Sequence, residues 1–496
     1  MNDESLQSQP SPDAPSTRPS LALSVVPVVF LVAALGLTIV WLKQPPHIPL
    51  ILATAVAALT AFGLGQSWRD LLDGIKNGIT VALPACLILL VIGTVIGTWI
   101  LSGIVPTLIV YGLEVVSPSY FLVTACVVCA VVALATGSSW STAGTVGIAL
   151  IGIAETLGIS RGLAAGAILS GAYFGDKMSP LSDTTNLAPA VAGTDLFSHI
   201  RHMVYTAGPS LVIALGAYFV IGLWYQGPGA EAKDIAVILA ELDLRFVIHW
   251  ALLLPLVAVI ALVVLRVPAL PALLAGTILG GVCAAIAQGA PLTEIVKSAQ
   301  SGYVSTTGIK GVDKLLSRGG LESMMSTVAL ILCALSFGGV MERSGMLRRL
   351  AEAIMLGARR TGSLVLRTLL TSIGMNILAA DQYMAIVVPG RMYREAYVAQ
   401  GLHAKNLSRC LEDAGTMTSA LVPWNTCGAY MSTTLGVSTF AYAPFAFVLL
   451  LNPVVSTVLG YTGWTMEEAA PSEGDEHEHD HVHVREHEHD DDDDDA

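Results

Sequence analysis

Four polar segments interrupt the apolar stretches of this sequence, and they hold the residues best suited to bind a small cation. Two lie in the first half, at 137–145 and 175–186, and two in the second half, at 376–383 and 412–426. They are rich in carboxylate, hydroxyl and amide oxygens, which are the ligands that hard cations prefer. We therefore predict an ion site at these breaks.

The carboxylates are the expected exchange groups. A carboxylate away from bulk water holds a proton at higher pH, because desolvation disfavours its charged form. The same oxygens would hold Na⁺ or H⁺ but not both, which suffices for antiport if the site faces each side in turn. Adjacent helical residues point about 100° apart, so one of Glu412 and Asp413 should face the ion, and we favour Asp413. The candidates are Asp176, Asp183, Asp381, Asp413 and Glu412.

Uncharged groups in the same segments are expected to complete the site. Proline has no N–H for the carbonyl four residues earlier. In a helix, Pro180 would free the carbonyl of Asp176, and Pro423 would free that of Ser419. We expect Lys177 to be the charge partner of an acid. The supporting ligands are Ser138, Ser139, Thr142, Ser179, Ser182, Thr184, Asn186, Asn376, Thr416 and Asn425.

Structural roles are open for several of these residues. Asp176 with Lys177 could cap a helix end, and Asp183 could be a helix N-cap. The small residues of 137–145 could form a seam where two helices pack closely.

A structural role is preferred for Glu412, which we expect to pair with Arg409 instead of binding an ion. Three histidines near span ends are expected at the surface: His199, His202 and His403.

The composition predicts a membrane protein. Of the 496 residues 54% are apolar and 13% charged, against about 25% charged in soluble domains. Runs such as 249–265 and 438–460 are apolar on every face, unlike the alternating strands of a barrel. We predict an all-α polytopic protein with about ten to thirteen transmembrane helices.

The predicted organisation is a disordered leader at 1–20, a transporter domain at 21–466 and a disordered acidic tail at 467–496. The tail has 15 acidic residues and one arginine, so it accounts for the net charge of −13. Its alternating histidines suit weak Zn²⁺ or Ni²⁺ binding, but a solvated disordered tail is the interpretation we prefer. They are His477, His479, His481 and His483.

The breaks suggest two pseudo-symmetric halves, at roughly 119–224 and 321–460. Broken helices or re-entrant hairpins from the two repeats of a transporter often meet at a midplane ion site. Asp176–Pro180–Asn186 and Asp413–Pro423–Asn425 look equivalent, although their spacings differ.

The arginines of 343–367 indicate a cytoplasmic segment. Arg391 and Arg394 follow the next apolar stretch. If both clusters are cytoplasmic, 363–390 enters and leaves the membrane on one side, which charge alone does not decide.

At these motifs the sequence resembles the NhaC family of Na⁺/H⁺ antiporters. The resemblance covers roughly 20–465 and is carried by four motifs: G-D-K-M-S-P-L-S-D-T-T-N at 175–186, G-S-S-W-S-T-A-G-T at 137–145, A-D-Q-Y-M-A-I at 380–386 and E-D-A-G-T at 412–416. It implies secondary active transport of Na⁺ and H⁺ in a prokaryotic inner membrane, without ATP or a cofactor. The expected partners are the lipid bilayer, small cations and a second copy of the chain, with no nucleic acid.

Organic-acid exchange of the malate/lactate type, coupled to Na⁺ and H⁺, is the alternative that the resemblance leaves open. An anionic substrate would need a basic group or free helix N-termini in the site. Lys177 is the only obvious cation near the breaks. No G-x-S-x-G nucleophile motif is present, and we expect a transporter rather than an enzyme.

Overall fold

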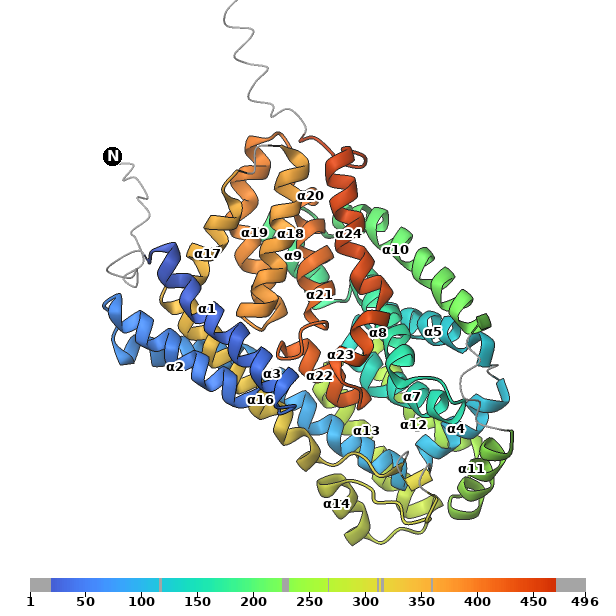
Figure 1. The fold of residues 1–496 in the computed structure, drawn as a ribbon. Coiled ribbons are helices and arrows are strands. Elements are labelled where there is room, and N and C mark those ends of the chain that lie inside the picture. The colour runs from blue at the N-terminus through green and yellow to red at the C-terminus, as the bar shows by residue number, and fades with distance from the viewer. Residues whose placement is uncertain are drawn as a thin grey trace, which may run out of the picture.

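A computed structural model describes residues 19–115, 118–224, 232–265, 267–309, 312–313, 316–357 and 360–469. These residues fold into helices and connecting loops, with two isolated bridges, Tyr303–Arg318 and Leu402–Glu468, in place of a sheet (Figure 1). The all-helical fold is therefore confirmed. The tail histidines lie outside the described residues.

The first part of the chain forms α1 (Leu21–Leu35), α2 (His47–Gly63), α3 (Trp68–Leu101), α4 (Ile104–Val115), α5 (Phe121–Thr136), α6 (Ser139–Thr142), α7 (Ile148–Thr156), α8 (Arg161–Met178), α9 (Asp183–Ala192) and α10 (Leu196–Trp224). The middle forms α11 (Ala232–Arg245), α12 (Leu254–Val264), α13 (Ala269–Ala287) and α14 (Leu292–Ser301). The last part forms α16 (Leu321–Arg343), α17 (Met346–Met355), α18 (Thr361–Leu378), α19 (Gln382–Ala399), α20 (Ala404–Leu411), α21 (Met417–Ser419), α22 (Thr426–Leu435), α23 (Thr439–Tyr442) and α24 (Phe447–Thr462). Short π-helical turns occur at η1 (Gly36–Trp41), η3 (Ala143–Gly147) and η5 (Glu412–Thr416), and 3₁₀ turns at η2 (Pro118–Tyr120), η4 (Trp250–Leu253) and η6 (Ala443–Phe445).

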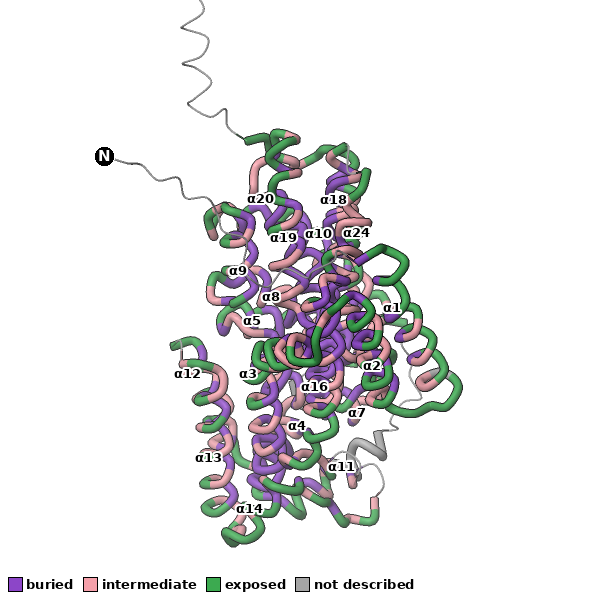
Figure 2. Tube along the Cα trace, turned by 90° about the vertical axis from the view of Figure 1, so that its left-hand side faces the viewer, coloured by how far each residue is buried: buried purple, intermediate pink, exposed green. Residues whose placement is uncertain are grey.

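The outer surface of the bundle is suited to lipid. Among the described residues, seven helices are long and apolar enough to cross a membrane, or up to nine if two bent pairs are counted. Large apolar side chains such as Val131, Val212 and Ile278 are more than half exposed on the outside. Figure 2 shows the buried residues gathered along the inner faces of the helices. The polar breaks keep further segments below the length or hydropathy of a continuous span.

Two long helices, α3 and α16, cross against each other and form one wall of the bundle (Figure 1). A Cβ on Gly78 would lie 2.9 Å from the Leu335 carbonyl oxygen, and one on Gly339 would lie 2.4 Å from that of Gly74. Glycine at the crossing therefore lets the two backbones approach closely.

The two halves have the same order of helices. In each half two helices meet at a first break, two more meet at a second break, and a final helix follows. In the first half these are α5, α6–α7, α8, α9 and α10. In the second half they are α18, α19, α20–α21, α22 and α24. Backbones with positive φ occur at positions 243 residues apart: Gly137 and Ala380, Gly158 and Gly401, Gly193 and Gly436.

The helix starts at the breaks have the same spacing, which corrects one expectation. The N-caps Ser138 and Asp381 are 243 residues apart, as are Ser182 and Asn425. At this spacing Pro180 corresponds to Pro423, as expected, but Asp176 corresponds to Ser419 and not to Asp413. The two halves therefore match in backbone conformation, but their acidic residues do not occupy equivalent positions.

Helices α18 and α19 form an antiparallel hairpin. The Thr368 and Tyr397 hydroxyls lie 3.3 Å apart, and the Thr371 and Tyr393 hydroxyls lie 2.9 Å apart. The outer ends of the two helices are therefore at the same end of the bundle, and the tip is at 379–381. This arrangement favours entry and exit of 363–390 on one side of the membrane.

In the first half, α8 packs in parallel against α5. A Cβ on Gly171 would lie 1.9 Å from the Cys126 carbonyl oxygen, and one on Gly175 would lie 2.2 Å from that of Ala130. The Gly/Ala-rich sequence of α8 thus allows a very close approach. This contact brings the C-terminal end of α8 to the break that follows α5.

Candidate functional site

All four polar breaks meet around one cavity of about 410 Å³, which we name the central cavity. Two of its walls are polar and come from the breaks of the two halves. Its apolar wall comes from α3. The residues that line it are Val81, Ala82, Pro84, Ala85, Ile88, Gly137, Ser138, Trp140, Asp176, Ser182, Asp183, Thr184, Ala269, Asp381, Gln382, Tyr383 and Thr426.

Three of the five predicted acids line this cavity. Asp176, near the end of α8, accepts hydrogen bonds at Oδ2 from the Ser139 backbone N–H (2.9 Å) and hydroxyl (2.6 Å). Asp381 is the N-cap of α19, and its Oδ1 accepts the N–H groups of Tyr383 and Met384. Each of these two carboxylates is thus held by backbone donors at one oxygen.

The third acid, Asp183, is the first residue of α9 and is exposed to the cavity. The N-cap position belongs to Ser182, so the proposed capping role of Asp183 is wrong. A carboxylate in the first turn still complements the positive end of the helix dipole.

The N-termini at the cavity are already matched by protein groups. Asp176 accepts from the start of α6, Asp381 caps α19, and Asp183 lies in the first turn of α9. The fourth start, that of α22, is capped by Asn425, whose Oδ1 accepts the Cys427 N–H. An anionic substrate would therefore meet a protein carboxylate or a capping amide at each of these N-termini, although the start of α9 has no side-chain cap hydrogen bond.

The cavity lining has a strongly negative character. Among the described residues that line it, three are carboxylates and none is Lys, Arg or His. Across the described part of the chain, no group of three His, Cys, Asp or Glu side chains is placed to hold one metal ion together. The three acids thus surround the cavity without converging on one point, and hydroxyl groups lie between them.

Lys177 points away from the cavity and pairs with Asp413. Its Nζ lies 2.8 Å from Asp413 Oδ1, and both side chains are 0% exposed. The Thr206 hydroxyl donates to the same oxygen at 2.8 Å, and Arg409 Nε lies 3.8 Å from Asp413 Oδ2. Asp413 therefore lies in a buried ion-pair cluster behind the cavity and is absent from the lining, contrary to our preference for it as the ion ligand.

Glu412 differs from its neighbour Asp413. It begins the π-helical turn η5, is fully buried, and neither carboxylate oxygen has a hydrogen-bond partner among the described residues. The expected pairing with Arg409 is wrong, because Arg409 is nearest to Asp413. Lys177 and Thr416 are among the neighbours of Glu412. π-Helical turns occur frequently at functional sites.

The two prolines end helices instead of exposing carbonyls within them. Helix α8 ends at Met178 and α21 ends at Ser419, before each proline. The Asp176 carbonyl accepts the Ser179 N–H at 3.0 Å. The expectation of freed carbonyl ligands is therefore wrong for Asp176.

Several predicted ligands have structural contacts. Asn186 donates to the Pro180 and Ser182 carbonyls. Asn376 donates to the Gly415 carbonyl at 2.7 Å, and Thr142 donates to that of Ser138. Among the predicted supporting ligands, Ser138, Ser182 and Thr184 line the cavity.

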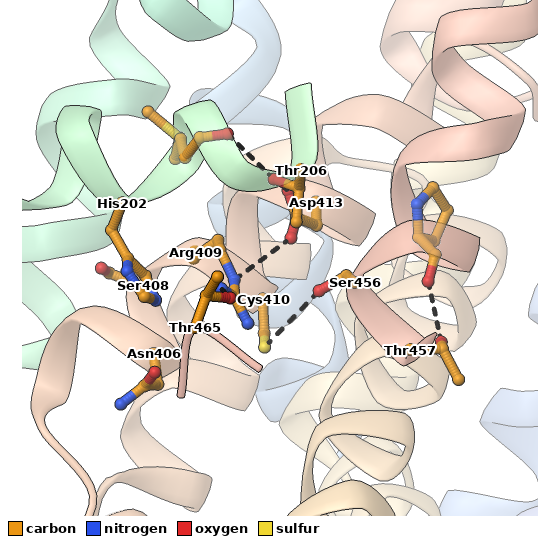
Figure 3. A network of polar contacts seen from close by, with 12 residues as sticks. His202, Thr206, Asn406, Ser408, Arg409, Cys410, Asp413, Ser456, Thr457 and Thr465 are labelled. Atoms are coloured by element: carbon orange, nitrogen blue, oxygen red, sulfur yellow. Dashed lines mark hydrogen bonds and ion pairs between the residues drawn. The ribbon is translucent and has the colours of Figure 1, made fainter. Parts of the chain in front are cut away.

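Sequence reasoning missed residues of two kinds. Gln382, Tyr383 and Thr426 line the cavity, and their position directly beside a helix start was a signal that could have identified them. His199 and His202 were expected at the surface but are 0% and 2% exposed. Their helix turns them inward toward α20, as Figure 3 shows for His202.

This arrangement defines a polytopic membrane transporter, with broken helices from two similar halves around a polar cavity. The family model described as the Na⁺/H⁺ antiporter family matches residues 171–464. The Na⁺/H⁺ antiporter NhaC of Alkalihalophilus pseudofirmus is 40% identical over 423 residues, which cover 85% of this chain and 91% of that protein. This chain belongs to the Na⁺/H⁺ antiporter family.

Other relatives have different substrates in their names. The malate-2H⁺/Na⁺-lactate antiporter of Bacillus subtilis is 38% identical over 435 residues, covering 88% of this chain and 93% of that protein. The arginine/ornithine antiporter ArcD of Halobacterium salinarum is 38% identical over 465 residues, covering 93% and 96%. Overall sequence identity therefore does not distinguish between these substrates. The substrate has to be inferred from the residues that line the cavity.

Proposed function

We propose that this chain exchanges Na⁺ for H⁺ across the inner membrane of a prokaryote. The observation that carries the proposal is the central cavity, where Asp176, Asp183 and Asp381 face the same space and no basic side chain is among the described lining residues. Such a lining attracts a cation and repels an anion. The relatives named as Na⁺/H⁺ antiporters support the same conclusion.

Competition for the carboxylates would couple the two ions. Na⁺ would be held by carboxylate oxygens of Asp176 or Asp381 together with nearby hydroxyls such as Ser138 and Thr426. Binding of H⁺ to the same carboxylates would remove the charge that holds Na⁺. The breaks at 179–182 and 420–425 join half-length helices, and movement at such joints would open the cavity to each side in turn.

Exchange of organic acids is less well supported. Two basic side chains beside the breaks, Lys177 and Arg409, are fully buried and lie next to Asp413 instead of lining the cavity. Side chains accept hydrogen bonds at the starts of α6, α19 and α22, and the start of α9 has Asp183 in its first turn. A carboxylate substrate would therefore meet three like charges and no basic side chain among the described lining residues.

Everted membrane vesicles test the proposal. Added Na⁺ should dissipate a preformed pH gradient, and Asp176→Asn should abolish the response, because an amide keeps the size of the side chain but holds neither H⁺ nor Na⁺ as a carboxylate does. Asp73→Asn is the matched control, since Asp73 is half-exposed and its ion pair among the described residues is with Lys76 in the same helix. A response to malate or lactate, but not to Na⁺ alone, would overturn the assignment.

The domain limits and the oligomeric state stay predictions. We propose that transport resides in 21–466 and that the chain forms a homodimer. Cross-linking in the native membrane tests the dimer. Transport by a chain that lacks 467–496, with and without added Zn²⁺, tests whether the tail regulates it.

A further inference from the structure

A polar seam runs between α10 and α20, outside the central cavity. We define the α10–α20 seam by His199, His202 and Thr206 on α10, together with Ser408, Arg409 and Asp413 on α20 and η5. Figure 3 shows His202, Thr206, Ser408, Arg409 and Asp413 in this region. All six side chains are buried, with relative exposures of 2% or less.

Direct contacts connect the two sides of the seam. His199 Nδ1 lies 2.8 Å from the Ser408 hydroxyl, and the Thr206 hydroxyl donates to Asp413 at 2.8 Å. Residues 199, 202 and 206 are spaced so that they share one face of a helix. The seam is thus a continuous polar face within a membrane span, where ionisable groups are costly and usually functional.

The hydrogen bonding of the seam is incomplete. His199 Nε2, both ring nitrogens of His202 and Arg409 Nε have no hydrogen-bond partner among the described residues. Polar side chains that only hold two helices together are expected to satisfy one another. Unpartnered imidazole nitrogens are instead free to accept or donate a proton.

The seam joins the bundle surface to the buried cluster. At its outer end, His202 Nδ1 lies 3.7 Å from the carboxylate of Glu467, whose side chain is 49% exposed. At its inner end, Lys177 is a neighbour of both His199 and Glu412. Other charged or titratable groups around His202 are Arg409, Lys405 and His403.

We propose that the α10–α20 seam is the route by which protons reach the transporter, and that Glu412 holds the proton at its inner end. Na⁺ would enter by the central cavity and protons by the seam, and Glu412 would hold each proton on its way to the cavity carboxylates, of which Asp176 is its neighbour. This inference rests on the proposed Na⁺/H⁺ exchange and adds a proton path and a proton-holding residue to it.

Each proton transfer leaves the net charge of the histidines and of Lys177 unchanged. An imidazole takes a proton on one ring nitrogen and releases one from the other. His199, Lys177 and Glu412 are not hydrogen-bonded to one another, so a water molecule would have to bridge each gap. Through such waters the ammonium of Lys177 would pass a proton to the Glu412 carboxylate and take one that His199 releases, so one N–H bond of Lys177 breaks as another forms. The added charge of the proton then resides on Glu412, which becomes neutral.

Two assays on purified protein in liposomes test the route. One measures proton movement driven by a Na⁺ gradient, and the other measures exchange of radioactive Na⁺ for Na⁺, which needs no proton. We expect His202→Leu and Glu412→Gln to slow proton movement about 100-fold, the scale of lost acid–base relay, while Na⁺/Na⁺ exchange stays near the wild-type rate. His249→Leu is the matched control, because His249 is exposed and lies before α12.

The outcomes separate this inference from the proposed function. If the wild-type protein moves no protons in response to Na⁺, the proposed function itself fails. If the wild type does so and the His202 and Glu412 variants keep full proton movement, the seam is not the route. An equal loss of both activities in these variants would show a structural role and would also overturn the inference. The Asp176→Asn variant should lose both proton movement and Na⁺/Na⁺ exchange, because it alters the proposed Na⁺ site.

Discussion

Neighbouring residues on one helix are divided between two sites at the centre of this protein. Asp176 faces the cavity and Lys177 faces Asp413, and similarly Glu412 and Asp413 have different surroundings. The 100° turn between adjacent helical residues causes this division. An acid next to another acid in the sequence therefore need not act on the same ion.

The pairing of Lys177 with Asp413 leads to a prediction about stability. Lys177→Met should lower the free energy of unfolding by about 3–5 kcal/mol, because it leaves a buried carboxylate without its partner. The double variant Lys177→Met with Asp413→Leu should recover most of that loss, since both charges are gone. Thermal unfolding in detergent measures both variants. Equal destabilisation by the single and double changes would show that the pair is not coupled.

At the scale of the elements, short breaks and close contacts place the polar groups. Each break ends one helix and begins another within a few residues, so carbonyl ends, N-termini and their capping acids gather at one level of the bundle. The contact between α5 and α8 brings Asp176 to Ser139. That contact depends on glycine, because a side chain would separate the two backbones.

Gly171→Ala tests this contact. Its Cβ would lie 1.9 Å from the Cys126 carbonyl oxygen, and we expect a loss of at least about 1–3 kcal/mol, the usual cost of overpacking. Gly374→Ala in α18 is the matched control, because no atom lies within 4 Å of its added Cβ. It should be neutral or slightly stabilising. Unfolding midpoints of the two variants should differ clearly, and similar midpoints would contradict the role of close packing.

At the scale of the whole molecule, the outer ends of the α18–α19 hairpin and residues 463–469, which follow α24, lie at one end of the bundle. Ala469 N–H donates to the Gly401 carbonyl, and a Cβ on Gly362 would contact Tyr461. The arginines of 343–367 are close in sequence to this end. The positive-inside rule then places it in the cytoplasm.

Cysteine labelling in whole cells tests that orientation. Leu356→Cys replaces an exposed residue between α17 and α18, and Val398→Cys replaces one at the end of α19. Leu292→Cys replaces an exposed residue at the start of α14. A membrane-impermeant maleimide should label the cysteine at 292 but not those at 356 and 398 until the cells are opened. Labelling of only one hairpin position in intact cells would show that the segment crosses the membrane once.

Much of the architecture could be predicted from the sequence. Apolar runs indicate spans, and Gly, Ser, Pro and Asp mark where helices stop and start, because local backbone preferences act over a few residues. The breaks at Ser138, Ser182 and Asp381 were found in this way, and so was the family resemblance. The cavity lining by Asp176, Asp183 and Asp381 follows from those breaks meeting.

Only the tertiary structure shows which polar side chains line the central cavity and which pair with one another behind it. Lys177 and Asp413 are 236 residues apart, and His199 and Ser408 are 209 apart. Which of these side chains meet depends on how α8, α10 and α20 pack, and local sequence does not encode that packing. The four polar breaks thus determined where the polar groups gather, while helix packing separated the central cavity from the buried ion pair and the α10–α20 seam behind it.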